Sequence, residues 1–198
     1  MYNRIRGAAA GFTLIELLIV IGIIVILSVV VILTLNPAQL LAQSRDSRRV
    51  SDLAALQSAI SLYLADATSP SIVSSSSPWR CYYNGSGFPA GGANACGGRF
   101  SNSQTSHAST TLGVSGGGWV PIDFTVVSSG APLSNLPVDP VNDSTHFMAY
   151  TGSSSLVYEI NVSLESTKYT TGAGSLLISD GGSSSTLYEV GTKSGLDL

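Results

Sequence analysis

The chain has 198 residues, which is enough for one domain and a membrane anchor. Charged residues make up 11% of it and the formal net charge is −3, and because no basic block follows Arg49, an extended nucleic-acid-binding surface is not indicated. Hydrophobic residues make up 44% and are concentrated in residues 1–35, whereas the remainder is rich in Ser, Thr and Gly, which suggests a solvated β-rich or loop-rich module.

The first element in chain order is a basic leader followed by an apolar run. Residues 1–11, MYNRIRGAAAG, contain Arg4 and Arg6 and no acid, and in residues 12–35 only Glu16 is ionisable. A helix over residues 12–35 would be about 36 Å long, sufficient for a bilayer core of about 30 Å. The positive flank predicts that the amino terminus faces the cytoplasm and that most of the chain lies outside.

The position of the small residues argues against an ordinary secretory signal. Such a signal has a shorter apolar core with a small-residue cleavage site after it, whereas here GAAAG precedes the core. Cleavage between Gly11 and Phe12 would remove the leader and leave the anchor on the mature protein. Phe12 would then be the first residue and Glu16 the fifth.

The residues Gly11, Phe12 and Glu16, at this spacing and followed by the apolar run, resemble the class III signal of type IV pilins and type II secretion pseudopilins. The resemblance covers about residues 1–65. It implies cleavage after Gly11 and N-methylation of Phe12 by a membrane-embedded prepilin peptidase. It also implies a helical homopolymer of this chain, with an assembly ATPase and a platform membrane protein as further partners.

The lone acid of the apolar run requires an explanation. A carboxylate at the centre of a membrane helix costs about 2.5–3.5 kcal/mol on insertion scales, although the cost falls near the helix end where Glu16 lies. In the resembling family, the partner of this acid is the new amino terminus of a neighbouring subunit. Glu16 would therefore fix the axial position of an incoming anchor. The alternative is that Glu16 extends to the cytoplasmic interface.

Residues 36–67 continue the helix. The Asn36-Pro37 pair predicts either a proline kink or a fresh helix that Asn36 caps and Pro37 begins. Apolar residues then recur at helical spacing, which predicts a face packed on a sheet: Val50, Leu53, Leu56, Ile60, Tyr63 and Ala67. The first part is charged, and its charges are expected either to pair between stacked subunits or to form a solvated face: Arg45, Asp46, Arg48, Arg49 and Asp52.

The composition and strand patterns of residues 68–198 predict an extracytoplasmic β-rich head. It begins with a polar linker, 68–78, and a cysteine loop, 81–96. A disulfide between Cys81 and Cys96 would contribute about 3 kcal/mol on the loop-entropy model and favours an oxidising compartment, with two free thiols as the alternative. We expect residues 101–118 to be flexible. The aromatic residues of the loop are expected to cover the sheet edge, with ligand contact as the alternative: Tyr82, Tyr83 and Phe88.

Strand patterns cluster in the second half of the head, and we expect an antiparallel sheet with hairpins. The predicted strands are residues 119–127, 146–151, 156–164, 175–179 and 186–190. The fold class is therefore α+β: a long N-terminal helix, membrane-spanning in its lower half, packed on a C-terminal antiparallel β-sheet head.

The loop at residues 136–143, LPVDPVND, resembles a loop of major pseudopilins in which calcium can bind. Asp139, Asn142 and Asp143 offer oxygen ligands, but the spacing is not that of an EF-hand and ordinary turn chemistry explains the residues. We therefore predict no metal. No nucleotide-binding, hydrolase or metalloprotease motif occurs either, so neither a cofactor nor an enzymatic activity is expected.

The leading hypothesis is a structural subunit of a type IV pilus-like filament. The precursor would span the inner membrane once with its amino terminus inside, and the product would be a cell-surface filament or periplasmic. One alternative is the major pseudopilin of a type II secretion system. An alternative of another class is a monomeric, membrane-tethered binding module that uses the aromatic residues near the cysteine loop. An anchored hydrolase ranks last because it lacks any motif.

Overall fold

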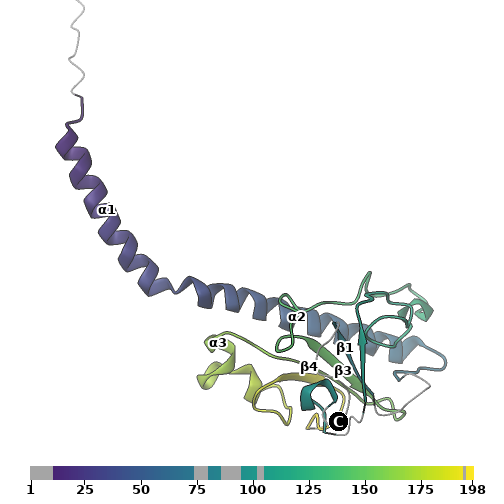
Figure 1. Cartoon of the computed structure of the whole chain (residues 1–198). Helices are drawn as coiled ribbons and strands as arrows, with labels where there is room; N and C mark the ends of the chain where they lie inside the picture. Colours follow the sequence, from purple (N-terminus) through teal and green to yellow (C-terminus); the bar gives the residue numbers. More distant parts are fainter. Residues whose placement is uncertain (1–10, 74–79, 86–94, 102–104, 194) are drawn as a thin grey trace, which may run out of the picture. The chain divides into compact units, whose positions relative to one another are not determined.

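The computed structural model describes residues 11–73, 80–85, 95–101, 105–193 and 195–198. Two compact units, Met1–Leu40 and Leu41–Leu198, make up the chain (Figure 1). Several features predicted from the sequence lie outside the described residues: the basic leader with Arg4 and Arg6, residues 74–78 of the linker, and Phe88 with the rest of residues 86–94.

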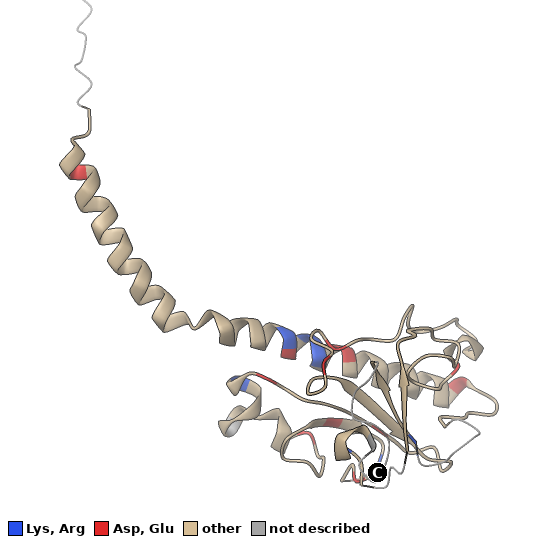
Figure 2. Cartoon of the chain, viewed as in Figure 1, with Lys and Arg blue, Asp and Glu red and all other residues tan. Residues whose placement is uncertain are grey.

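Helix α1, Leu14–Leu35, accounts for most of the described part of the first unit. Its composition is almost wholly apolar, and its single charged residue, Glu16, lies in the first turn (Figure 2). The polar side chains inside it bond to its own backbone: Ser28 Oγ donates to the Ile24 carbonyl at 2.7 Å, and Thr34 Oγ1 donates to the Val30 carbonyl at 3.0 Å. These side chains therefore do not need water, which suits a helix in lipid.

Helix α2, Pro37–Asp66, is a separate helix that Asn36 introduces. Asn36 adopts a left-handed backbone, with φ 42° and ψ 76°, and ends α1. Its carbonyl accepts hydrogen bonds from the backbone N–H groups of Gln39 at 3.0 Å and Leu40 at 3.3 Å. Pro37, which lacks an N–H, occupies the first helical position, where none is needed. Of the two predicted alternatives, the fresh helix is confirmed.

The second unit contains a five-stranded sheet. Its strands are β1 (Arg80–Asn84), β2 (Thr105–Ser109), β3 (Met148–Gly152), β4 (Tyr158–Val162) and β5 (Tyr188–Gly191), in the spatial order β2-β1-β3-β4-β5. Three of the four pairings are antiparallel, which confirms the α+β class, but β1 and β2 run parallel, which corrects the purely antiparallel expectation.

One face of the sheet packs against α2. The helix contributes Leu53, Leu56, Ile60 and Tyr63 to a core that also contains the sheet residues Tyr82, Tyr150, Tyr158 and Ile160. The predicted apolar face of α2 is thus confirmed, although Val50 at its start is only half-buried. Burying each of the larger apolar side chains stabilises the fold by about 1.5–3 kcal/mol, so this layer is the main reason that the head folds.

The opposite face carries a smaller cluster and several buried polar groups. Cys81 and Tyr83 of β1 pack there with Cys96, Phe100 and Phe147. Because side chains alternate along a strand, the same face of β4 and β5 carries the polar residues that interrupt the apolar ones: Glu159, Asn161 and Glu189.

Two predicted strands are wrong. Within residues 119–127, Phe124–Val126 form a short 3₁₀ helix, and Asp123 caps it by accepting a hydrogen bond from Thr125 N at 3.0 Å. Within 175–179, Leu176–Ile178 form another such helix. Most apolar residues of 119–127 are nevertheless buried in the core, although Val126 is 54% exposed. The pattern therefore indicated burial correctly, but capping by Asp123 and the missing N–H of Pro121 favour a turn over strand pairing.

Two strands were not predicted. β1 lies inside the sheet between β2 and β3, so Tyr82 and Tyr83 are buried, each only 3% exposed. This corrects the expectation that they cover a sheet edge. β2, in a segment expected to be flexible, is a polar edge strand whose sequence, TSHAS, shows no apolar alternation. The predicted strands at 146–151, 156–164 and 186–190 are confirmed, with ends shifted by a few residues.

Candidate functional site

The predicted processing site precedes α1. Gly11 and Phe12 are both exposed, and Phe12 is 92% exposed. A Cβ added to Gly11 would meet nothing within 4 Å, and Gly11 has no left-handed backbone conformation that would favour glycine. The folded chain therefore does not need glycine at this position. Any requirement for it must come from another molecule.

Glu16 caps its own helix. Its Oε2 atom accepts hydrogen bonds from the backbone N–H of Thr13 and from Thr13 Oγ1, both at 2.8 Å. In return, Thr13 Oγ1 accepts a hydrogen bond from Glu16 N at 3.3 Å. This is a complete capping box, which satisfies donors at the start of the helix.

The capping box was missed in reading the sequence, although T-x-x-E before an apolar run is its usual signal. The capping box gives Glu16 a role within its own chain, in addition to the two hypotheses of pairing with a neighbouring subunit and of extending to the interface. Within the described part of the chain, both bonds use Oε2, and Oε1 accepts none. One carboxylate oxygen thus fixes the helix start, and the other is available to a partner.

The surface of α1 has no cover within its own unit. No residue of the helix is buried, and its apolar side chains are about half to nine-tenths exposed. By length and composition, α1 can cross a membrane. A surface of this kind is not stable in water, so it requires lipid or other apolar helices around it.

In the head, a buried arginine on α2 gathers three carboxylates. Arg49 is fully buried; its Nε and Nη2 atoms donate to Asp139 at 2.7 and 2.8 Å, and Nη1 donates to Asp46 at 2.9 Å. Nη1 also pairs with Glu165. Although burial opposes its charge, the hydrogen bonds to Asp139, Glu165 and Asp46 raise the pKa of Arg49.

The same carboxylates bind a second arginine and the backbone. Arg45 Nε donates to Glu165 at 3.0 Å. The hydrogen bonds from Arg45, followed by those from Arg49, lower the pKa of Glu165 to about 2. Asp46 accepts the backbone N–H groups of Glu165 at 3.0 Å and Ser166 at 2.7 Å. We call Arg45, Asp46, Arg49, Asp139 and Glu165 the arginine cluster.

The arginine cluster corrects the expectation for the charges at 45–52. Arg45, Asp46 and Arg49 form ion pairs with residues of their own head, so they are neither unpaired charges left for a second subunit nor a solvated face. Only Arg48 and Asp52 form a looser pair, 3.5 Å apart, in which the Arg48 side chain is 66% exposed. The helical spacing places Asp46 near Arg49, but it does not show Asp139, which is 90 residues from Arg49, or Glu165, which is 120 residues from Arg45.

The three side chains of the loop at 136–143 that could offer oxygen ligands all make contacts within the head. Asp139 binds Arg49 and the backbone N–H of Val141, at 2.9 Å. Asn142 Nδ2 donates to Asn84 at 2.9 Å, and Asp143 accepts the N–H groups of its own turn. Among the described residues, no three His, Cys, Asp or Glu side chains converge to hold a metal.

Two buried carboxyl groups meet on the other face of the sheet. Glu159 on β4 and Glu189 on β5 are each 1% exposed and lie close enough to interact electrostatically. Glu159 Oε2 also accepts Leu198 N at 3.1 Å, and Glu189 Oε2 accepts Ser184 N at 2.7 Å. Burial raises the pKa of Glu159 to about 8 and raises that of Glu189. The carboxyl pair, Glu159 and Glu189, therefore retains a proton near neutral pH.

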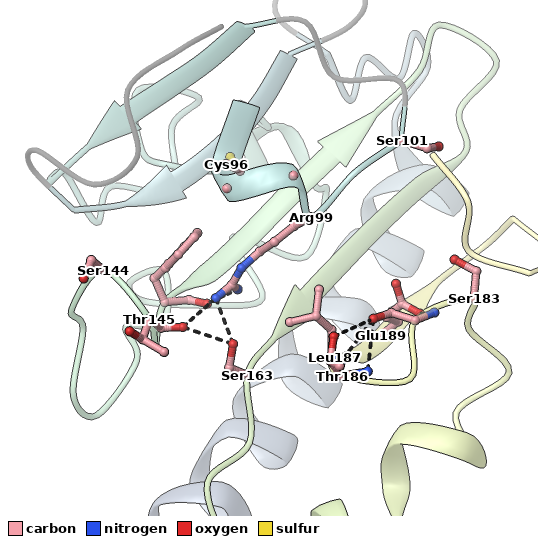
Figure 3. Close-up of a pocket in the computed structure, with 14 residues that line it drawn as sticks. Cys96, Arg99, Ser101, Ser144, Thr145, Ser163, Ser183, Thr186, Leu187 and Glu189 are labelled. Carbon is pink, nitrogen blue, oxygen red and sulfur yellow. Dashed lines mark hydrogen bonds between the residues drawn. The ribbon is translucent and has the colours of Figure 1, made fainter. Parts of the chain in front are cut away.

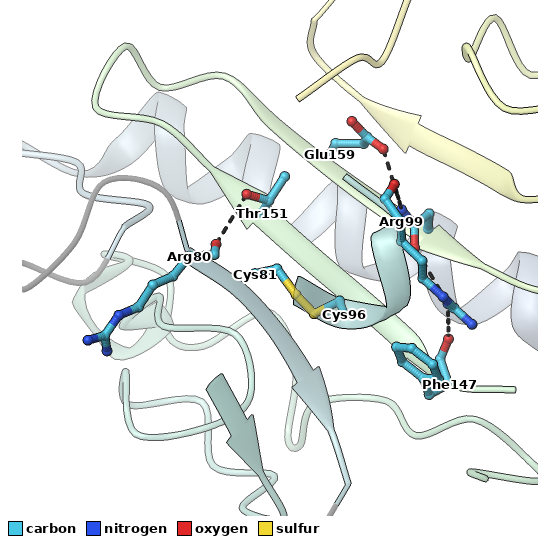
Figure 4. The surroundings of a disulfide bond; sticks show 8 residues. Arg80, Cys81, Cys96, Arg99, Phe147, Thr151 and Glu159 are labelled. Atoms are coloured by element: carbon cyan, nitrogen blue, oxygen red, sulfur yellow. Dashed lines mark hydrogen bonds between the residues drawn. A yellow bond between two sulfur atoms is a disulfide. The ribbon is translucent and has the colours of Figure 1, made fainter. Parts of the chain in front are cut away.

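The disulfide joins β1 to a short 3₁₀ helix, Ala95–Gly98, that covers this face (Figure 4). Both cysteines are fully buried. Tyr83 belongs to the smaller cluster that contains both cysteines, and Tyr82 lies in the main core. The Tyr82 ring is 5.6 Å from that of His107. The two tyrosines are thus packing residues, which removes the surface that the binding-module hypothesis assigned to them.

Comparison with known proteins identifies the amino-terminal segment. Residues 6–32 match the prokaryotic N-terminal methylation motif. The match includes Gly11, Phe12 and Glu16, and it confirms the class III signal of type IV pilins and pseudopilins that the sequence predicts. It implies processing by a prepilin peptidase and assembly into filaments in general. No curated protein and no solved structure matches the chain.

Proposed function

We propose that this chain, which carries the class III signal of type IV pilins and pseudopilins, is a structural subunit of a type IV pilus-like filament. The peptidase cuts between Gly11 and Phe12, and the mature protein polymerises through α1. One observation supports this most directly: no residue of α1 is buried within its unit, and the fold does not require the glycine that shortly precedes the helix.

The physical basis of assembly is burial of α1. The membrane covers the helix in the precursor. When a subunit leaves the bilayer, the same apolar surface must be covered by the helices of other copies. At about 25 cal/mol per Å² of apolar surface removed from water, this burial supplies the main attraction between subunits. The heads, with their own core, then remain outside the helical bundle.

Glu16 supplies the axial position. Cleavage creates a positive amine at Phe12, and Oε1 of Glu16 on a neighbouring subunit is available to bind it. A charge pair is strong in an apolar surrounding and an unpaired charge is costly there, so one axial position is favoured over the others. The capping box keeps the carboxylate oriented while it does so.

The remaining partners and the location follow from this proposal. An assembly ATPase and a platform membrane protein would extract and add subunits, and the product would be a surface filament or a periplasmic one. The disulfide and the Ser- and Thr-rich head favour a surface pilin. A major pseudopilin of a type II secretion system is the second candidate, since the same anchor serves both.

The decisive experiment is mass spectrometry of the mature protein. The proposal expects an amino-terminal N-methyl-Phe12. An intact Met1, or cleavage beyond Leu35, would overturn it and leave a membrane-tethered monomer.

A pair of variants separates the two roles of Glu16. Glu16→Gln keeps an acceptor for the capping box but removes the charge. Thr13→Val removes the side chain of the cap and keeps the charge. We expect both variants to be processed, Glu16→Gln to lose most of its filaments and Thr13→Val to retain them. A normal filament yield from Glu16→Gln would rule out the pairing role.

A further inference from the structure

A hollow of about 510 Å³ opens on the face of the head that carries the disulfide (Figure 3). Half of the residues that line it are Ser or Thr, among them Ser144, Thr145 and Ser163, and they come from several segments far apart in the sequence. Arg99, at the end of the disulfide-bonded turn, extends across it. The wall is therefore rich in hydroxyl groups and contains one permanent positive charge.

Neutral groups hold Arg99 in place. Nη1 donates to the Phe147 carbonyl at 2.6 Å and to Asn161 Oδ1 at 3.5 Å. Nη2 donates to the Thr145 carbonyl at 2.8 Å and to Ser163 Oγ at 2.9 Å. The guanidinium carbon lies 3.5 Å from the centre of the Phe147 ring. Within the described residues, Nε donates to no acceptor. The guanidinium is thus fixed in position with one donor left over, so an incoming ligand does not have to order it.

Arg99 has no carboxylate partner. All 12 acidic residues of the sequence lie in the part of the chain that the structure describes, and none of them forms an ion pair with Arg99. The acid that lines the hollow, Glu189, belongs to the carboxyl pair, and burial raises its pKa. Burial likewise lowers the pKa of Arg99, to about 10, which leaves it charged at neutral pH.

We propose that this hollow binds an acidic carbohydrate, with the carboxylate of the sugar against Arg99 and its hydroxyl groups against the Ser and Thr side chains. A carboxylate supplies the counter-charge that the protein does not, and a guanidinium binds it with charge-assisted hydrogen bonds. The hydroxyl-lined wall complements a polyol, whereas one face of the Phe147 ring is already covered by Arg99. The proposal concerns the head alone and does not depend on polymerisation.

The test is a titration of the full-length protein in detergent micelles, followed by the NMR signal of the Arg99 Nε–H group at constant ionic strength. Three probes are compared: sodium D-glucuronate, which has both features, sodium sulfate, which has only the charge, and D-glucose, which has only the hydroxyl groups. We expect saturable binding of glucuronate at least tenfold tighter than that of either other probe. Sulfate binding as tight as glucuronate, glucose binding as tight as glucuronate, or no saturable shift would each overturn the proposal.

Variants identify the site. Ser144→Asp adds a carboxylate to an exposed position on the wall and should weaken glucuronate binding at least tenfold without disturbing the fold. Ser154→Asp, on an exposed turn outside the hollow, adds the same charge and should leave the affinity unchanged. Equal affinities of the two variants would contradict the assignment. Arg99→Gln should also abolish binding, but it removes contacts of the fold, so its melting temperature must be measured alongside.

Discussion

The head buries two groups of carboxylates in opposite ways. The arginine cluster places Asp46, Asp139 and Glu165 around a fully buried guanidinium, whereas the carboxyl pair places Glu159 against Glu189, and neither of these forms an ion pair within the described residues. In the first group the arginines lower the pKa of Glu165 to about 2. In the second a proton takes the place of the cation, and the pKa of Glu159 rises to about 8.

The difference shows that burial alone does not decide the charge of an acid. Desolvation opposes ionisation in both groups, and the presence or absence of a hydrogen-bonded cation decides the outcome. The two groups also lie at different places in the fold. The arginine cluster ties α2 to loops at 139 and 165–166, and the carboxyl pair joins β4 and β5 to the final residues.

Removing the cation should have the largest effect. Arg49→Met leaves Asp46 and Asp139 buried without their partner, and such a loss typically costs about 3–5 kcal/mol. Denaturant unfolding of the head should therefore show a large fall in stability. Arg48→Met, in which the replaced side chain is mostly exposed, is the matched control and should change stability by less than about 1 kcal/mol. Similar stability of the two variants would show that the cluster contributes nothing.

Removing the proton of the carboxyl pair by raising the pH should have the second-largest effect on stability. Because the folded pKa of Glu159 lies above its ordinary value of 4.5, the stability it contributes is fully present below about pH 4.5 and is lost as the pH rises to about 8. The loss is on the order of a few kcal/mol, since each pKa unit corresponds to about 1.4 kcal/mol. Glu159→Gln, which mimics the protonated acid, should be more stable than the parent at pH 9 and should flatten this dependence.

The measurement is a series of unfolding curves from pH 4 to pH 9 for the parent protein and Glu159→Gln. The assignment of a retained proton to the carboxyl pair is wrong if the parent protein gains stability from pH 4 to pH 9. It is also wrong if the stability of Glu159→Gln depends on pH as steeply as that of the parent.

Glu165 should produce a smaller effect of opposite sign. Its folded pKa, about 2, lies below its ordinary value of 4.5, so its contribution is present above pH 4.5 and is lost as the pH falls toward 2. Glu165→Gln should lower stability at neutral pH by about 1–2 kcal/mol, in the range of hydrogen bonds to charged groups, and should weaken the acid dependence. Acid unfolding followed by circular dichroism measures this, and an unchanged acid midpoint would contradict it.

Calcium should have the smallest effect. Because Arg49 already neutralises Asp139, adding millimolar calcium or removing it with EDTA should leave the melting temperature unchanged. A rise in melting temperature that saturates with calcium would show that the loop at 136–143 binds the ion after all.

The sequence could predict elements whose pattern is local. The apolar run of residues 12–35, with Glu16 as its single acid and Gly11 before it, was enough to predict the membrane anchor and the processing signal, because neither depends on a distant contact. The spacing of Leu53, Leu56, Ile60 and Tyr63 likewise determined which face of α2 is buried. The capping box of Thr13 and Glu16 was equally local and readable, and only its signal was overlooked.

The tertiary structure alone decided which charges meet and which strands pair. Arg49 and Asp139, or Glu159 and Glu189, are brought together by chain folding over long separations, and nothing in their immediate neighbours predicts it. The same holds for β2, whose residues have no apolar alternation and form a strand because β1 offers them backbone partners. Local order follows from the periodicity of apolar side chains along the chain, whereas the ionisation of buried acids depends on the groups that the fold places around them.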